Sequence, residues 1–295
     1  MNPLGLPTLA AVLGRQPPSL LHHYTSSDGL IGMLKNKEIW ATNIAFLNDS
    51  KEVGHAVDYA KNAIENKIHR GGLSESQIDI LNAMHGRAGN AAKRYYVASF
   101  SEDGNLLSQW RAYCPPGGGY SVGIPSAQLT SMAQEQQFVL VPCVYEHNLQ
   151  SQIINELVDF HLADAVNCLS VAPIPENSSD HPFWRFTQRL TQVGCVLKHG
   201  SFKEEREWRL ISQPIQEPHA QLDFRSSPSR IVPFFRFKLA SPSNPNLGTR
   251  ENATFTIISG PTSDREITSM AMQFMIASHL PAAAFGSSDI PYRTW

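Results

Sequence analysis

Three short segments of the sequence combine side chains that could bind and cleave a small molecule. They cover residues 22–26, 110–113 and 205–209, and they join imidazole, hydroxyl, guanidinium, carboxylate and aromatic groups. A guanidinium binds phosphate oxygens in pairs, and a carboxylate stabilises positive charge that develops in a reaction. These residue types would suit a ligand that carries phosphate and a glycosidic bond.

The first segment, His22-His23-Tyr24-Thr25-Ser26, lies at the end of a predicted strand. Residues 20–24 favour a strand, and the hydroxyls that follow can cap a helix that stops near Asn36. A second short strand is predicted at 39–42, and the polar turn at 46–50 can start the next helix. The imidazole and hydroxyl groups are thus expected at a strand end, where a ligand can reach them.

In the second segment Arg111 lies between Trp110 and Tyr113 on a short helix predicted over 106–113. A guanidinium between aromatic rings could hold a diphosphate and stack on a base. The alternative is that both aromatic residues anchor the core and that Arg111 pairs with Glu102 or with backbone carbonyls. The glycine-rich turn that follows matches neither a Rossmann fingerprint nor a P-loop, which excludes those two nucleotide sites.

The third segment is a charged run that leads directly into an apolar strand. If the run is already extended, alternation places Glu205, Glu207 and Arg209 on one face. A carboxylate at a sheet end could stabilise the charge that forms when a glycosidic bond breaks. A solvated run of charges is the alternative, and the sequence does not decide between Glu205 and Glu207.

Composition excludes several classes of protein. Of the 295 residues, 42% are hydrophobic and 17% are charged, as in ordinary globular proteins, and the net charge of −2 argues against a strong general attraction to nucleic acid. No segment approaches the roughly eighteen apolar residues of a membrane span. The four cysteines are widely spaced without a CxxC motif, so we expect free thiols, no metal site and a cytoplasmic location.

We expect residues 20–295 to form a single α+β domain with a mixed or split sheet flanked by helices, after an irregular lead-in over residues 1–19. The other predicted strands are 95–101, 120–124, 137–145, 232–239, 253–258 and 283–287. The other predicted helices are 51–67, 74–94, 148–171, 181–197 and 260–279. The two helices within 148–197 are expected to be an insertion between strands.

A set of motifs in this order resembles an uncharacterised, mainly bacterial family catalogued as domain of unknown function 2971. The motifs are HHYTS, EIWAT, FLND, FSEDGNLLSQWRAY, GGGYSVG and FKEEREWRLI. The resemblance extends from about Leu20 to the PYR near the C-terminus. It implies no particular reaction.

The strand end at His23, with Thr25 and Ser26 after it, is also similar to the first motif of ADP-ribosyltransferases of the diphtheria-toxin and poly-ADP-ribose-polymerase kind. In those enzymes a His and a hydroxyl at this place hold the NAD ribose, and Gly stands where this chain has Tyr24. Their final motif has a Glu at the start of a strand, which resembles Glu207 or Glu205 here.

This second resemblance implies an ADP-ribosyltransferase-like fold and an enzyme that cleaves NAD and transfers ADP-ribose to a protein, a nucleic acid or water. Glu207, Glu205 and His23 would be catalytic. The residues expected to bind NAD are His23, Tyr24, Thr25, Ser101, Trp110, Arg111, Tyr113 and Tyr120. Such bacterial families suggest a toxin or a phage-defence effector.

Two other classes of function remain as alternatives. One is an RNA-directed nuclease or phosphotransferase that uses His23 as acid or base and Arg111 with Lys203 on phosphates. The other is a non-catalytic ligand-binding or interaction module, in which the polar strand ends satisfy backbone groups.

Overall fold

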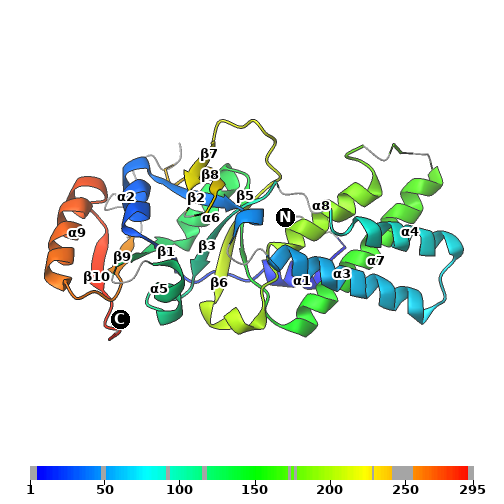
Figure 1. Cartoon of the computed structure of the whole chain (residues 1–295), viewed down its shortest axis with the longest axis horizontal. Coiled ribbons are helices and arrows are strands. Elements are labelled where there is room, and N and C mark those ends of the chain that lie inside the picture. Colours follow the sequence, from blue (N-terminus) through cyan, green and yellow to red (C-terminus); the bar gives the residue numbers. More distant parts are fainter. Residues whose placement is uncertain are drawn as a thin grey trace.

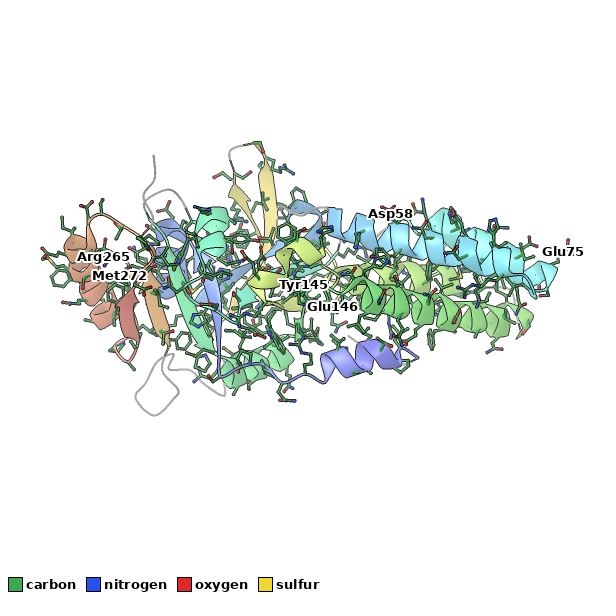
Figure 2. All side chains as sticks on the ribbon, turned by 90° about the horizontal axis from the view of Figure 1, so that it is seen from below. Asp58, Glu75, Tyr145, Glu146, Arg265 and Met272 are labelled. Atoms are coloured by element: carbon green, nitrogen blue, oxygen red, sulfur yellow. The ribbon has the colours of Figure 1, made fainter. Side chains whose placement is uncertain are left out.

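The protein has a sheet-containing half and a helical half that lie next to each other along the long axis of the molecule (Figure 1). The structure is a computed structural model that describes residues 5–47, 51–90, 94–114, 118–171, 174–175, 178–227, 229–240 and 255–291. Tyr145 and Glu146 lie between the two halves, Glu75 lies at the far helical end, and Arg265 lies at the opposite end (Figure 2).

Ten strands of the described chain form one mixed sheet. Its main path is β10-β9-β4-β1-β3-β2-β8-β7, while β6 pairs with β3 and with β5. All pairs are antiparallel except β9 with β10. The strands are β1 Leu20–Thr25, β2 Glu38–Asn43, β3 Tyr96–Ser101, β4 Tyr120–Pro125, β5 Phe138–Pro142, β6 Glu207–Ser212, β7 Leu222–Ser226, β8 Ile231–Lys238, β9 Thr256–Ser259 and β10 Ala284–Ser287.

The sheet is split beside β3. One edge of β3 pairs with β6 from Val97 to Ser101. The other edge is shared, because β1 pairs with it at Ser101 and β2 pairs with it at Tyr96 and Val97. β1 and β2 therefore diverge between these points, and the middle of β3 borders the gap. The sheet is mixed, as predicted, and it is also split.

Helices flank this sheet and form the second half. In the helical half α1, α3, α4, α7 and α8 pack on one another, and α2, α5, α6 and α9 lie against the strands (Figure 1). The helices are α1 Pro7–Leu13, α2 Ser27–Asn36, α3 Lys51–Arg70, α4 Glu75–Arg87, α5 Leu107–Tyr113, α6 Ser126–Glu135, α7 His147–Val171, α8 Pro182–Gly194 and α9 Arg265–His279, with 3-10 turns η1 Ile44–Phe46 and η2 Gly200–Glu205.

Local signals explain several of these elements. The Ser26 side chain caps α2 by accepting a hydrogen bond from the Gly29 amide at 3.2 Å, as predicted. Ser74 and Gln77 form a capping box at the start of α4. Two apolar cores result, one among the helices and one around the sheet. None of the helices in the described part of the chain is long and apolar enough to cross a membrane.

The prediction of an irregular lead-in over residues 1–19 is wrong for residues 7–13, which form helix α1. Pro7 is the first residue of α1, where a missing amide proton costs nothing. Leu6, Leu9 and Val12 are buried in the helical core, and the Thr8 amide donates to Glu156 of α7 at 3.0 Å. Pro7 therefore marks the start of a helix.

Other differences concern short elements and their boundaries. The sequence analysis did not identify α6 or β7, and α4 ends at Arg87, before the predicted 94. η2 occupies the charged run as far as Glu205, so the run is not extended there, and β6 begins at Glu207. Most of the polar turn predicted at 46–50 lies outside the described residues.

Candidate functional site

A cavity of about 750 Å³ opens where the sheet splits. Residues of β1, α2, β2, β3, α5, β6 and β7 line it, together with Lys198 and Glu205. Small-molecule sites typically have volumes of roughly 300–1,000 Å³, so this cavity can hold a ligand of dinucleotide size. The split sheet thus creates the candidate site.

His23 forms part of the cavity wall on β1. Its Nδ1 lies 2.9 Å from the Ser99 carbonyl oxygen in the middle of β3. Enclosure by the walls lowers the pKa of His23; the bond to the Ser99 carbonyl opposes this effect, and the nearby Arg225 adds to it. The ring is therefore neutral at pH 7, with its proton on Nδ1, and Nε2 is left as an acceptor.

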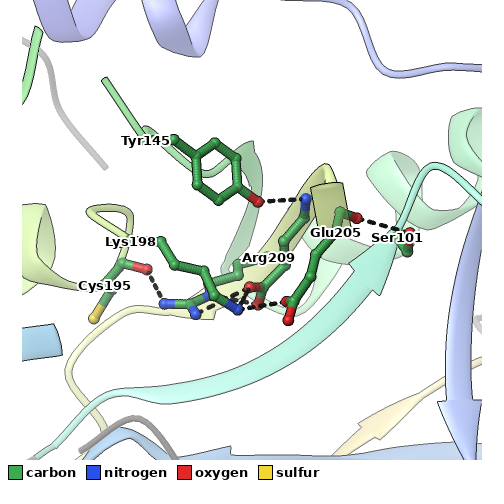
Figure 3. A network of polar contacts seen from close by, with 7 residues as sticks. Ser101, Tyr145, Cys195, Lys198, Glu205 and Arg209 are labelled. Atoms are coloured by element: carbon green, nitrogen blue, oxygen red, sulfur yellow. Dashed lines mark hydrogen bonds and ion pairs between the residues drawn. The ribbon is translucent and has the colours of Figure 1, made fainter. Parts of the chain in front are cut away.

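A buried group of two carboxylates and two cations also lines the cavity, and Figure 3 shows the contacts within this group. Lys198 Nζ lies 2.6 Å from Glu205 Oε2 and 2.5 Å from Glu207 Oε2. Arg209 Nε lies 2.7 Å from Glu207 Oε1, and its Nη1 donates to the Cys195 carbonyl at 2.8 Å. The four side chains are at most 8% exposed. We call them the ion network.

The strand register places this network. Glu207 pairs with Ser101 of β3, and Arg209, two residues further on, lies on the same face of β6. Between η2 and β6, Arg206 adopts a left-handed conformation with φ of 42°, and Glu205 lies beside Glu207 at Lys198. Close packing of the two carboxylates thus depends on this sharp turn.

Further hydrogen bonds hold the backbone of the network. The Ser101 hydroxyl donates to the Glu205 carbonyl at 2.8 Å. The Glu207 amide donates to the Tyr145 hydroxyl at 2.8 Å (Figure 3). β3 therefore holds the backbone of Glu205, and the segment after β5 holds the backbone of Glu207. These bonds preorganise the two carboxylates.

Electrostatics keep the network charged. Burial alone would raise the pKa of Glu207, but Arg209 and Lys198 outweigh burial and lower it to about 2. For Lys198, burial acts to lower the pKa, and the attraction of Glu207 raises it above its ordinary value. Both residues are ionised at pH 7. Buried charges of this kind are tolerated because each has a partner.

The structure brings six of the predicted site residues to the cavity. They are His23, Tyr24, Thr25, Tyr113, Glu205 and Glu207. Tyr24 was predicted to bind NAD, but its hydroxyl makes hydrogen bonds within the protein. It donates to the Asp103 carbonyl and accepts from the Leu106 amide, both at 2.8 Å. Its ring is buried, so Tyr24 shapes the wall.

The other four predicted residues, Ser101, Trp110, Arg111 and Tyr120, do not line the cavity. Trp110 is buried, donates from Nε1 to Asn105 Oδ1 at 3.1 Å and packs edge-on against Tyr24. This outcome corresponds to the alternative in which Trp110 anchors the core. Ser101 supports the backbone of Glu205, and Arg111 is exposed outside the cavity. The geometry therefore does not support a diphosphate clamp built on Arg111.

Sequence reasoning missed three cavity cations. Alternation placed Arg209 on the face of Glu207 but gave no reason to pair them. Lys198 reaches the carboxylates because η2 brings Glu205 back toward it, and no periodic pattern signals such a turn. Arg225 lies on β7, a strand that the sequence analysis did not identify. Within the described residues, no three His, Cys, Asp or Glu side chains are placed to hold a metal ion.

The fold and the cavity define a mixed α+β protein with a cavity of small-molecule size at a split in its sheet. Residues 109–210 match the sequence model of a family described as a protein of unknown function, DUF2971. This segment covers about a third of the chain and includes Lys198, Glu205 and Glu207. The predicted resemblance to that family is thus supported for this segment. Searches of curated proteins and of solved structures found no match, so neither supports a resemblance to ADP-ribosyltransferases.

Proposed function

We propose that the protein is an ADP-ribosyltransferase-like enzyme that cleaves NAD and transfers ADP-ribose to an acceptor. One observation carries this proposal: His23 and Glu207, which are far apart in the sequence, line the same cavity. Strand pairing brings the two strands together, because Ser101 of β3 pairs with Glu207 on one side and with His22, the neighbour of His23, on the other. A histidine and a carboxylate can thus act on one ribose.

In this proposal His23 and Thr25 orient the ribose next to nicotinamide. The neutral His23 ring can accept a hydrogen bond from a ribose hydroxyl through Nε2, while its bond to the Ser99 carbonyl fixes the ring. A neutral imidazole also suits NAD, whose nicotinamide ring is positively charged before cleavage. Positioning of this kind supplies a large part of the rate gain in enzymes.

Glu207 then stabilises the charge that develops on the ribose. When the bond between C1′ and the nicotinamide nitrogen breaks, the electron pair leaves with nicotinamide, which becomes neutral. The ribosyl C1′ becomes oxocarbenium-like, bonds to a nucleophilic atom of the acceptor, and the acceptor loses one proton. A carboxylate held ionised and rigid by Lys198 and Arg209 needs little reorganisation to stabilise that charge.

The RNA-directed alternative receives less support from the geometry. Lys198 and Arg209, the most buried cations of the cavity, are both paired with carboxylates, which leaves little net positive charge for a phosphodiester there. Lys203, which that alternative requires, is exposed outside the cavity lining and pairs with Glu146 at 2.8 Å.

The test is release of nicotinamide from NAD by the purified chain, with and without cell lysate. We expect release by the parent protein and a loss of about 100-fold or more in Glu207→Gln and in His23→Ala. Glu205→Gln in parallel identifies which carboxylate is needed. Matched controls are Glu204→Gln and His69→Ala, both at exposed positions outside the cavity lining, which should retain parental rates.

Absence of release by the parent, with and without lysate, would overturn the proposal. Equal rates in the parent and in Glu207→Gln would also overturn the assigned role and favour a binding module. Recovery of the label on protein, on nucleic acid or as free ADP-ribose then identifies the acceptor. A toxin or antiviral defence effector is the biological role that we propose for such a reaction.

A further inference from the structure

We propose that Arg225 binds the diphosphate of the nucleotide ligand, and that Trp40 provides a stacking surface for the base next to it. This inference rests on the proposed function, and it assigns the phosphate-binding role to a strand that the sequence analysis did not identify. Arg225 lies on β7, and both residues line the cavity.

Arg225 differs from the other cations that line the cavity in its contacts. Three cations line the cavity, and two of them, Lys198 and Arg209, belong to the ion network. Arg225 has no ion-pair partner within the described residues; its Nη2 donates to the Thr42 hydroxyl at 3.2 Å. A cavity-lining guanidinium that has no carboxylate partner of its own is suited to an anionic ligand, and phosphate oxygens match its donors.

The guanidinium of Arg225 also affects the pKa of His23. Burial lowers the pKa of Arg225 from its ordinary value, and Arg225 in turn contributes to the low pKa of His23. Both side chains line the same cavity, so one ligand can contact both. A diphosphate attached to the ribose would neutralise the guanidinium while the ribose contacts His23.

Strand register places Trp40 on the same face as Arg225. Arg225 pairs with Val232 of β8 and Trp40 pairs with Arg236, so their partners lie four positions apart on β8, an even offset that keeps both on one face. The guanidinium of Arg225 reaches Thr42, which is two residues from Trp40, or roughly 7 Å along the strand. This separation fits a phosphate and the base of the same nucleotide.

The side chain of Trp40 is fixed by its neighbours, which suits a surface on which a base stacks. Its ring stacks on Phe234 at 4.5 Å between centroids with a 27° tilt, and its Nε1 donates to Glu38 at 3.1 Å. The residue is nevertheless 37% exposed. An aromatic ring that is fixed but exposed at a cavity wall can stack on a base at low entropic cost.

The test measures equilibrium binding to the full chain by calorimetry, with ADP-ribose and nicotinamide riboside as probes. Arg225→Gln should weaken ADP-ribose binding by roughly tenfold to hundredfold, because hydrogen bonds to a charged group are lost. Arg225→Lys should have a smaller effect because it keeps the charge. Nicotinamide riboside has no phosphate, so its binding should not change. Trp40→Leu should weaken ADP-ribose binding but not that of ribose 5-phosphate.

The control is Arg230→Gln, an exposed arginine of the same hairpin that does not line the cavity. Unchanged ADP-ribose binding in Arg225→Gln, equal losses for both probes, or no ADP-ribose binding by the parent would overturn the inference. The proposed function fails separately: ADP-ribose binding that depends on Arg225 without nicotinamide release would leave this inference standing. Nicotinamide release by the parent, together with an unchanged KM for NAD in Arg225→Gln, would support the proposed function and overturn this inference.

Discussion

His161 should make the protein less stable in mild acid. The residue lies on α7 in the helical core, is 3% exposed, and neither ring nitrogen has a hydrogen-bond partner within the described residues. Burial lowers its pKa to about 4, with Asp164 opposing the shift and Arg189 and Arg185 adding to it. The folded protein therefore keeps this ring neutral at a pH where the unfolded chain protonates it.

The magnitude follows from proton linkage. With an unfolded pKa of about 6.5 and a folded pKa of about 4, His161 costs about 0.2 kcal/mol at pH 7 and about 2 kcal/mol at pH 5. The loss begins as the pH falls below the unfolded pKa and is complete below the folded pKa. His161→Leu fills a similar volume beside Phe160 and Phe186 without a titrating group.

Urea denaturation of the parent and of His161→Leu at pH 7 and pH 5 measures this effect. Every other titrating group is common to both proteins, so the difference between the two pH dependences isolates His161. We expect the variant to lose about 2 kcal/mol less than the parent between pH 7 and pH 5. His69→Leu, at an exposed position on α3, should behave as the parent does. Identical pH dependences of the parent and His161→Leu would refute the reasoning.

Two further predictions concern the site and its surroundings. Lys198→Met should lower the free energy of unfolding by about 3–5 kcal/mol, because two buried carboxylates lose their shared cation, whereas Lys203→Met should change it by less than about 1 kcal/mol in the same urea titration. A similar cost for both variants would contradict the ion network. Trp110→Phe should lower stability by about 1 kcal/mol through loss of the hydrogen bond to Asn105 and leave ADP-ribose binding unchanged by calorimetry; a selective loss of binding would contradict its assignment to the core.

Much of the fold follows from local patterns. The strand-favouring residues at Leu20–Thr25, the cap at Ser26 and the capping box at Ser74 all predict elements that the structure contains. The split of the sheet does not follow from such patterns. It arises because β1 and β2 share one edge of β3 while β6 takes the other, and these pairings join segments more than fifty residues apart.

The candidate site shows the same limit. His23 and Glu207 can be predicted as site residues from their residue type and their position at strand ends, and both line the cavity. Trp110 was predicted as a site residue on the same grounds of residue type, but it is buried in the core. An aromatic side chain suits either environment, so residue type alone does not decide between them. Lys198 and Arg225 depend on a 3-10 turn and on a five-residue strand, and neither element has a strong signal in the sequence.

The most direct test of the central claim is a double-mutant cycle on nicotinamide release from NAD. If His23 and Glu207 act on one ribose in one cavity, the variant that carries both His23→Ala and Glu207→Gln should be little slower than the slower single variant. Melting curves of all three variants must show that they are folded. Rate losses that multiply in the double variant would show that the two residues act independently, and they would contradict the account.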